Sequence, residues 1–301
     1  MAAKLTLGPL LYNWPPEKWR DFYFRVADEA PVDIVYLGEV VCSKRLPFIT
    51  PNLSEVTERL IAGGKDVVYS TLALIMNQHE RAMVADLAGA AEQLIEANDI
   101  SAVSLLGGKP HVIGPYINTY NEGTAAYFIE RGAVRIVLPA ELPLDSLSAL
   151  VDSGAELEMQ VFGRLPLAIS ARCYHARSQN LHKDNCQYVC GEDADGMEVE
   201  TLDSEKFLAV NGTQTLSHSY YNLAAELDLL AEHGITHFRL SPQNIDMVAA
   251  AKCFRDRLQG AIDTDQALDQ LQTYSHGVPF ANGFLKGQPG LQWTPAQIGA
   301  E

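Results

Sequence analysis

Asp33-Ile34-Val35-Tyr36-Leu37, followed by Gly38, is a short apolar run that contains two β-branched residues and ends at a glycine. A run without polar alternation is typical of a parallel strand that is buried on both faces. Similar runs recur along the chain, and the stretches between them have the spacing of amphipathic helices. The sequence therefore predicts strands at Leu5–Gly8, Asp33–Leu37, Asp66–Leu72, Ala102–Leu106, His111–Gly114, Val134–Leu138, Leu157–Phe162 and His237–Leu240, with helices that include Pro16–Ala30, Asn52–Ala62, Glu80–Ala97 and Asn121–Arg131.

Strands that alternate with helices in this way predict an α/β protein with a (β/α)8, TIM-barrel-like fold. Two spacings fit it poorly: only Gly107–Pro110 separates the fourth and fifth predicted strands, and a long segment separates the seventh and eighth. A doubly wound open sheet is the competing architecture. We expect one barrel-like domain over residues 1–301, with an insertion at 163–222 before the last strand and an irregular C-terminal strap at 274–301.

Composition excludes several classes of partner. The chain has 22 Lys and Arg against 38 Asp and Glu, which gives a net charge of −16. Phosphate backbones are bound by clustered basic residues, so this balance argues against nucleic acid as a partner. The N-terminus has no apolar signal region, and no apolar run reaches the ~20 residues that a transmembrane helix needs. We expect a cytoplasmic protein without a membrane span, in which thiols stay reduced.

Four of the five cysteines lie in polar or basic surroundings, namely Cys42, Cys173, Cys186 and Cys190. Their spacing differs from the paired C-x2-C knuckles of structural zinc sites. A cubane iron–sulfur cluster takes four thiolates from any distance in the sequence, and this set supplies them. Zinc bound by four cysteines and four unrelated thiols are the alternatives.

Two of these cysteines follow predicted strands. Cys42 comes after Asp33–Leu37, and Cys173 follows the seventh predicted strand. Active sites of barrel proteins form at the carboxyl ends of the strands, so both thiols are expected at that rim. Glu39 and Arg172 lie beside them in the sequence and are the candidates for polar catalytic roles. For Glu39 the alternative is a loop residue or an ion-pair partner of Arg45.

The remaining candidates are weaker. Cys253 lies in a helical pattern among alanines, where a cysteine packs as a small apolar residue. His175 and His182 are alternative ligands near the cysteines, and Tyr120 and Asn121 follow a strand and could line a pocket. The sequence has no zinc-protease helix motif, nucleophile elbow or Walker loop.

Several blocks of the chain resemble one known family, the collagenase-like peptidases. The similarity runs from Leu7-Gly8-Pro9 to the C-terminal region. The blocks that carry it are Tyr36–Arg45, Leu165–Cys173 with the following Cys186 and Cys190, Arg239–Gln243, Asn282–Phe284 and Pro289-Gly290.

This resemblance implies a barrel-like fold and a 4Fe–4S cluster held by Cys42, Cys173, Cys186 and Cys190. It also implies an accessory role in oxygen-independent ubiquinone biosynthesis, at the hydroxylation of an aromatic ring. The implied partners are a second member of the same family, in a heterodimer, and a lipid-carrier protein that presents the prenylated precursor. The alternative is a hydrolase or peptidase with a structural four-cysteine metal site, although no protease constellation is found in the sequence.

Overall fold

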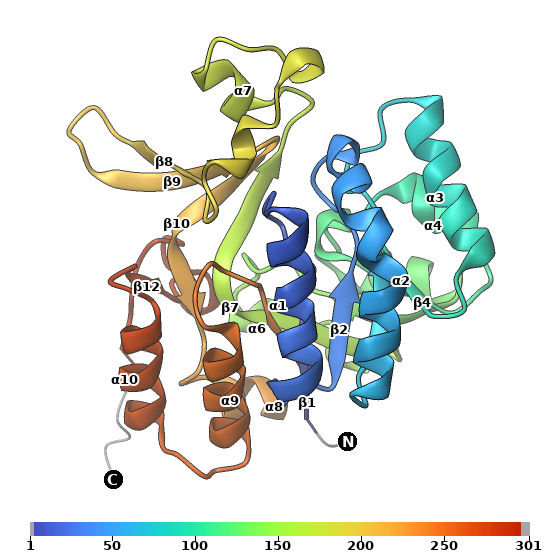
Figure 1. Cartoon of the computed structure of the whole chain (residues 1–301). Helices are drawn as coiled ribbons and strands as arrows, with labels where there is room; N and C mark the ends of the chain where they lie inside the picture. The colour runs from blue at the N-terminus through green and yellow to red at the C-terminus, as the bar shows by residue number, and fades with distance from the viewer. Residues whose placement is uncertain (1–2, 296–301) are drawn as a thin grey trace, which may run out of the picture.

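The computed structural model describes residues 3–295, and its core is a closed barrel of eight parallel strands (Figure 1). Neighbouring strands pair in sequence order, and the last strand pairs with both the first and the seventh, which closes the ring. The barrel strands are β1 (Lys4–Leu7), β2 (Ile34–Leu37), β3 (Asp66–Ser70), β4 (Leu94–Ala97), β5 (His111–Ile113), β6 (Ala133–Val137), β7 (Glu156–Ile169) and β11 (Ile235–Leu240). The predicted TIM-barrel-like fold is confirmed, and the open sheet is excluded.

Helices cover the outside of the barrel and bury their apolar faces against it. In the first of them, Trp19, Tyr23 and Val26 lie at helical spacing and are buried. No helix within residues 3–295 is long and apolar enough to cross a membrane. The helices are α1 (Pro16–Glu29), α2 (Leu46–Ala62), α3 (Gln78–Ala90), α4 (Ile100–Leu106), α5 (Glu122–Ile129), α6 (Leu144–Leu147), α8 (Leu227–Glu232), α9 (Met247–Leu258) and α10 (Thr264–Tyr274).

One predicted strand is wrong, and its correction explains a spacing that did not fit the barrel. Ala102–Leu106 lies in helix α4, and the fourth strand is Leu94–Ala97, inside the stretch predicted as the end of a helix. The Asp99 side chain accepts a hydrogen bond from the backbone N–H of Ser101 at 2.8 Å and starts α4 there. The crossover between the fourth and fifth strands therefore has its helix.

The interior of the barrel contains a buried network of charges. The guanidinium of Arg239 donates from Nε to Glu158 and from Nη2 to Glu96, both at 2.7 Å. Thr6 donates its hydroxyl to the same Glu158 carboxylate at 2.6 Å. Burial alone would raise the pKa of Glu158, but Arg239 and Arg135 outweigh it and lower that pKa to about 2. The network thus keeps an ionised carboxylate in the middle of the fold.

Strand β7 continues beyond the barrel and carries a second, antiparallel layer, the upper part of Figure 1. Its second half pairs with β10 (Gln214–Asn222), which pairs with β9 (Lys206–Asn211), and β9 pairs with β8 (Met197–Glu200). Gly163 marks the branch: its φ is +102°, and a Cβ there would lie 2.7 Å from the Ser241 carbonyl oxygen. We call residues 163–222 the extension.

The C-terminal region packs beside the extension. After α10 ends at Tyr274, strand β12 (Phe280–Ala281) adds to β10 in a parallel pairing. The Asn282 side chain accepts from the backbone N–H of Thr294 at 2.8 Å and donates to its carbonyl oxygen at 2.8 Å. The last part of the expected strap, residues 296–301, lies outside the described residues.

Candidate functional site

Four cysteines from three parts of the sequence line one cavity, which we call the cysteine cavity: Cys42, Cys173, Cys186 and Cys190. Cys173 and Cys190 are buried, and the other two are half-buried. Lys44, Arg45 and Lys183 line the same cavity. The fold thus brings together the four thiols that the sequence singled out.

The fifth cysteine lies elsewhere. Cys253 is 1% exposed in the core, on α9, and its thiol donates to the Ala267 carbonyl oxygen at 3.5 Å. Burial raises the pKa of Cys253 to about 12. It therefore behaves as the apolar core residue that the sequence predicted.

Cys42 is placed by the turn that follows β2. The turn begins at Gly38, whose φ of +133° and close approach to the Ser70 carbonyl oxygen exclude a side chain. The buried carboxylate of Glu39 then accepts from the backbone N–H groups of Val41 and Cys42, at 2.8 and 2.9 Å. Glu39 thus holds the shape of the loop, and its Oε1 lies 3.9 Å from Nη1 of Arg45.

Arg45 connects this turn to the extension. It is 2% exposed, and its guanidinium donates to the Leu11 carbonyl oxygen at 3.0 Å and to Oδ1 of Asn211 at 2.6 Å. Asn211 in turn donates to the carbonyl oxygen of Cys190 at 3.2 Å. The buried Nε of Arg45 has no hydrogen-bond partner among the described residues. A cationic group with an unused donor therefore lines the cysteine cavity.

Cys173 and Cys190 each receive a hydrogen bond at sulfur. Cys173 caps the short helix α7 (Tyr174–Ser178), and its Sγ accepts from the backbone N–H of Ala176 at 3.4 Å. The Asn13 side chain donates to Sγ of Cys190 at 3.5 Å. Donors to sulfur stabilise the thiolate and tune a bound iron–sulfur group.

A tight turn brings Cys186 and Cys190 to the same cavity. Gln187 and Tyr188 between them have φ values of 49° and 57°, which reverse the chain within one turn. Lys44 donates to the carbonyl oxygen of Lys183 at 2.6 Å and so fixes this segment against the Cys42 turn. This hydrogen bond joins the side of the cavity that carries Cys42 to the side that carries Cys186 and Cys190.

Burial raises the pKa of the Cys42 and Cys173 thiols, and in Cys42 the carboxylate of Glu39 adds to the effect while Arg45 opposes it. A metal group that takes these sulfurs as thiolates must therefore displace protons. Lys44, Arg45 and Lys183 supply positive charge around the cavity to offset four thiolates.

The metal groups that four thiolates can hold differ in the spacing between the sulfurs that they require. In the part of the chain that the structure describes, no group of three or more His, Cys, Asp or Glu side chains is arranged to hold a single metal ion. Zinc–sulfur bonds of about 2.3 Å would draw four sulfurs to within about 4 Å of one another. In a cubane cluster each thiolate binds a different iron, so the sulfurs stay farther apart. Four cysteines around a shared cavity supply the donor type that either group takes.

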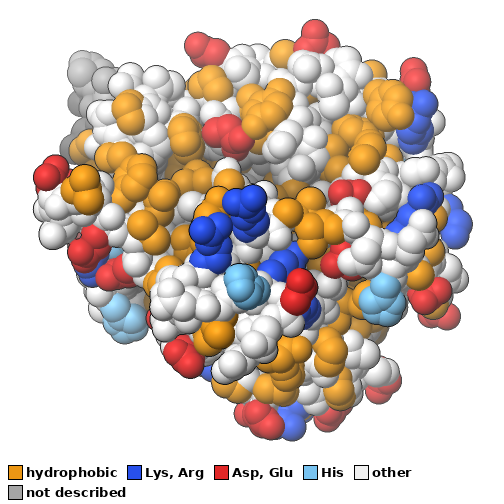
Figure 2. Space-filling model, turned by 90° about the horizontal axis from the view of Figure 1, so that it is seen from above, with side chains coloured by type: hydrophobic (Ala, Val, Ile, Leu, Met, Phe, Trp, Pro, Cys, Tyr) orange, Lys and Arg blue, Asp and Glu red, His pale blue; other side chains and the backbone are white. Residues whose placement is uncertain are grey.

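The other predicted site residues have different positions. Arg172 is exposed and lies in a neighbouring hollow with Arg177, His182 and Lys183, next to Cys173. Figure 2 looks down on this end of the molecule and shows Lys and Arg side chains gathered near its middle. His175 is buried, with Nε2 2.9 Å from the Asp193 carboxylate. Neither histidine lines the cysteine cavity.

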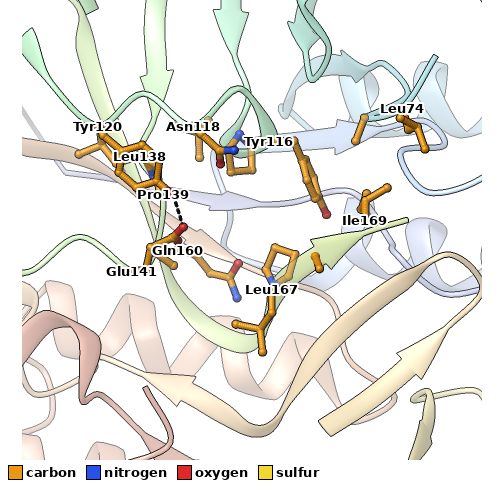
Figure 3. A pocket seen from close by; sticks show the side chains of 16 residues that line it. Leu74, Tyr116, Asn118, Tyr120, Leu138, Pro139, Glu141, Gln160, Leu167 and Ile169 are labelled. Atoms are coloured by element: carbon orange, nitrogen blue, oxygen red, sulfur yellow. Dashed lines mark hydrogen bonds between the residues drawn. The ribbon is translucent and has the colours of Figure 1, made fainter. Parts of the chain in front are cut away.

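A second cavity of about 320 Å³ lies at the mouth of the barrel, and sequence reasoning identified only Tyr120 of its lining. Its walls follow strand ends: Ala73 and Leu74 after β3, Pro115, Tyr116, Asn118 and Tyr120 after β5, Pro139–Glu141 after β6, and Gln160 and Pro166–Ile169 of β7 (Figure 3). Asn121 caps α5 instead, where it accepts from the Thr124 N–H at 2.9 Å. The residues directly after each predicted strand were the sequence signal that could have identified this lining. We call this the barrel-mouth cavity.

Comparison with known proteins identifies the family. A family model described as Peptidase family U32 matches residues 18–295. A solved structure, the U32 peptidase Mk0906, is 11% identical and covers 81% of this chain and 94% of its own, with a TM-score of 0.43. A mutant tryptophan synthase alpha-subunit from Pyrococcus furiosus is 11% identical, covers 90% of this chain and 98% of its own, and has a TM-score of 0.28. The fold assignment rests on the strand pairing and not on these two likenesses.

Proposed function

The chain belongs to Peptidase family U32, and we propose that within this family it is a UbiV-like protein that binds a 4Fe–4S cluster. In this proposal it acts with a UbiU-like partner, as a heterodimer, in the oxygen-independent hydroxylation of an aromatic ring during ubiquinone biosynthesis. The observation that carries the proposal is the convergence of Cys42, Cys173, Cys186 and Cys190 on one cavity. The end-to-end resemblance of the sequence supports the pathway.

The residues of the cysteine cavity are suited to hold such a group. The four thiolates would be its ligands, and the N–H of Ala176 and the amide of Asn13 already donate to two of the sulfurs. When bound, a cluster of this kind takes up and releases single electrons at a potential set by nearby charge and hydrogen bonds. Arg45, buried against the cavity, would lower the net negative charge there.

The lining of the cysteine cavity supports a shared active site. Its lining includes no Asp, Glu or His side chain that could move a proton. We therefore propose that the chain is one subunit of a cytoplasmic hydroxylase and that the partner completes the reacting site. We further propose that a lipid-carrier protein presents the prenylated precursor to this heterodimer.

Iron analysis of single-cysteine variants tests the cluster. Protein purified without oxygen should contain iron and acid-labile sulfide and absorb broadly near ~400 nm, as thiolate-bound iron–sulfur clusters do. Replacing Cys42, Cys173, Cys186 or Cys190 with Ala should each remove most of the iron. Cys253→Ala is the matched control and should retain it, because that thiol lies in the core. Zinc in place of iron, or iron loss only in the control, would refute the assignment.

A genetic test addresses the pathway. Deletion of the gene should abolish quinone formation only under anaerobic growth, and the four cysteine variants should fail to restore it. The family name suggests a different outcome, in which the isolated chain cleaves peptides. A substantial peptidase rate that survives all four cysteine substitutions would replace the proposal.

A further inference from the structure

An open hollow of about 560 Å³ lies beside the cysteine cavity, and we call it the basic hollow. Its cationic residues are Arg172, Arg177 and Lys183, and His182 lines it with them. No Asp or Glu lines the hollow, although the chain has 38 acidic residues against 22 basic ones. A chain with a net charge of −16 thus has a local patch of positive charge at the end of the molecule seen in Figure 2.

The chain folds back on itself to form the basic hollow. Helix α7 carries Arg177, and the backbone N–H of Asn180 donates to the Arg177 carbonyl oxygen at 3.0 Å. Asn180 has a φ of 56°, in the left-handed region that asparagine tolerates better than most residues. The chain reverses there, and His182 and Lys183 therefore line the same hollow as Arg177.

The two arginines of the basic hollow are free to bind another molecule. Arg172 and Arg177 are exposed, and neither guanidinium has an ion-pair partner within residues 3–295. Three acidic residues of the same segment do not line the hollow: Asp184, Glu192 and Asp193. A guanidinium is weakly hydrated and binds carboxylates in bidentate geometry, so this surface favours a ligand that carries carboxylates.

The basic hollow adjoins the cysteine cavity, because Cys173 and Lys183 line both. Two exposed aromatic residues lie close by in the chain. Tyr174 directly follows Cys173 and is 48% exposed, and Tyr188 of the cysteine cavity is 40% exposed. Tyrosine and arginine are enriched in protein–protein interfaces. The surface beside the four thiols therefore has the composition of a docking site for a protein.

We propose that the basic hollow is the docking surface for a small acidic electron-carrier protein. The inference rests on the proposed function, because a redox group in the cysteine cavity is what such a carrier would serve. The reduced carrier gives up one electron and the bound cluster takes it up, and no bond forms or breaks. Docking at the hollow would place the carrier next to Cys173, which lines both sites.

Local charge decides whether an acidic protein can approach this acidic chain. At an ionic strength of about 0.15 M, charges more than about 8 Å apart are largely screened from one another. A protein at the hollow therefore interacts mainly with Arg172, Arg177 and Lys183 and much less with the distant acidic surface. Complementary charge speeds association, and weak redox encounters bury little surface. The expected complex is short-lived and sensitive to salt.

Calorimetry on the full chain tests the docking surface with a plant-type 2Fe–2S ferredoxin as the acidic probe. Ferredoxin should bind, and its Kd should rise roughly tenfold between about 0.05 M and about 0.3 M salt, because the charges are screened. No binding at low salt, or binding that salt does not weaken, would overturn the proposal. Citrate binding without ferredoxin binding would make the hollow a site for a small anion and would also overturn it.

Charge reversal locates the binding. Arg172→Glu combined with Arg177→Glu should weaken ferredoxin binding at least about tenfold, because like charges then face each other. Arg172→Lys combined with Arg177→Lys keeps the charge and should bind within about threefold of the wild type.

The matched control changes the net charge equally at another place. Arg59→Glu combined with Lys252→Glu replaces two exposed cations on α2 and α9, which do not line the hollow. It should change the affinity for ferredoxin by less than about threefold. An equal loss in the control and in the hollow variant would show that net charge alone governs binding, and the docking surface would be refuted.

Iron content separates this inference from the proposed function. Arg172 and Arg177 do not line the cysteine cavity, so the charge-reversed chain should keep its iron. A chain with a full cluster that does not bind ferredoxin would refute the docking surface and keep the cluster. A chain that contains zinc in place of iron, and whose ferredoxin binding is lost on charge reversal, would refute the cluster and keep the surface for an acidic protein.

Discussion

The barrel and the extension are stabilised in different ways. The barrel closes on itself through eight paired strands and buries Glu96, Glu158 and Arg239 inside. In the extension, the outer strands β8 and β9 leave many side chains in solvent, and Leu202 and Phe207 are exposed. The barrel therefore has its own core, whereas the part of the chain that carries three cysteines does not.

The extension is attached to the barrel side through apolar residues that share the barrel's core, among them Leu165, Ala209 and Leu216, and through polar contacts. Trp14 donates its indole N–H to the Ala194 carbonyl oxygen at 2.7 Å, and Arg45 donates to Asn211 at 2.6 Å. Such contacts are individually modest. The order of the cysteine segment thus depends on anchoring residues and, in our proposal, on metal ligation, which stabilises the folded form only when it binds.

The largest effect is expected inside the barrel. Arg239→Met removes the cation between Glu96 and Glu158 and leaves two buried carboxylates without their main partner. Breaking a buried ion pair on one side costs about 3–5 kcal/mol. Denaturant unfolding of the variant should show a loss of this size.

The control is an arginine in an exposed pair. Arg59→Met breaks a 2.6 Å contact to Asp28 on the surface, where ion pairs contribute little to stability. Equal losses of unfolding free energy in the two variants would show that the buried network contributes no more to stability than an exposed ion pair.

Acid should weaken the barrel through the same network. The pKa of Glu158 is lowered to about 2 in the fold, because Arg239 and Arg135 outweigh its burial. A carboxyl with a depressed pKa stabilises the fold above its unfolded value of about 4.3, and the stabilisation is lost as the pH falls from there toward 2. The loss attributable to Glu158 is roughly 3 kcal/mol. The free energy of unfolding, measured between pH 5 and pH 2, should decrease less steeply with falling pH in Glu158→Gln than in the wild type.

Most barrel strands were predictable because buried parallel strands leave a local signal. Asp33–Leu37 and Leu157–Phe162 are apolar runs, and both contain strands of the barrel. Ala102–Leu106 was predicted as the fourth strand in place of Leu94–Ala97 because both stretches are short and mostly apolar. Only the helix cap at Asp99 shows that the strand ends before it and that a helix begins after it. Apolar content alone cannot distinguish the two.

The candidate site was also predictable only in part. Cys42 was predictable at the rim because it closely follows β2, whereas Cys173 follows the part of β7 that runs beyond the barrel into the extension. Both thiols stand out in the sequence because their surroundings are polar. The barrel-mouth cavity was largely missed, because Tyr116 and Gln160 are ordinary residues until strand pairing brings them together. The role of Arg45 also depended on the fold, since its partner Asn211 lies in the extension.

The smallest effects compare the two polar residues that the sequence placed beside the cysteines. Glu39→Ala leaves the backbone N–H groups of Val41 and Cys42 without their acceptor and should cost about 1–3 kcal/mol. Because the Cys42 turn loosens, iron content should fall as well. Arg172 is exposed and forms no ion pair within residues 3–295, so Arg172→Gln should change stability by less than about 0.5 kcal/mol. Denaturant unfolding and iron analysis of both variants check this, and a larger loss in Arg172→Gln would mean that the extension has a stabilising contact of its own at that residue.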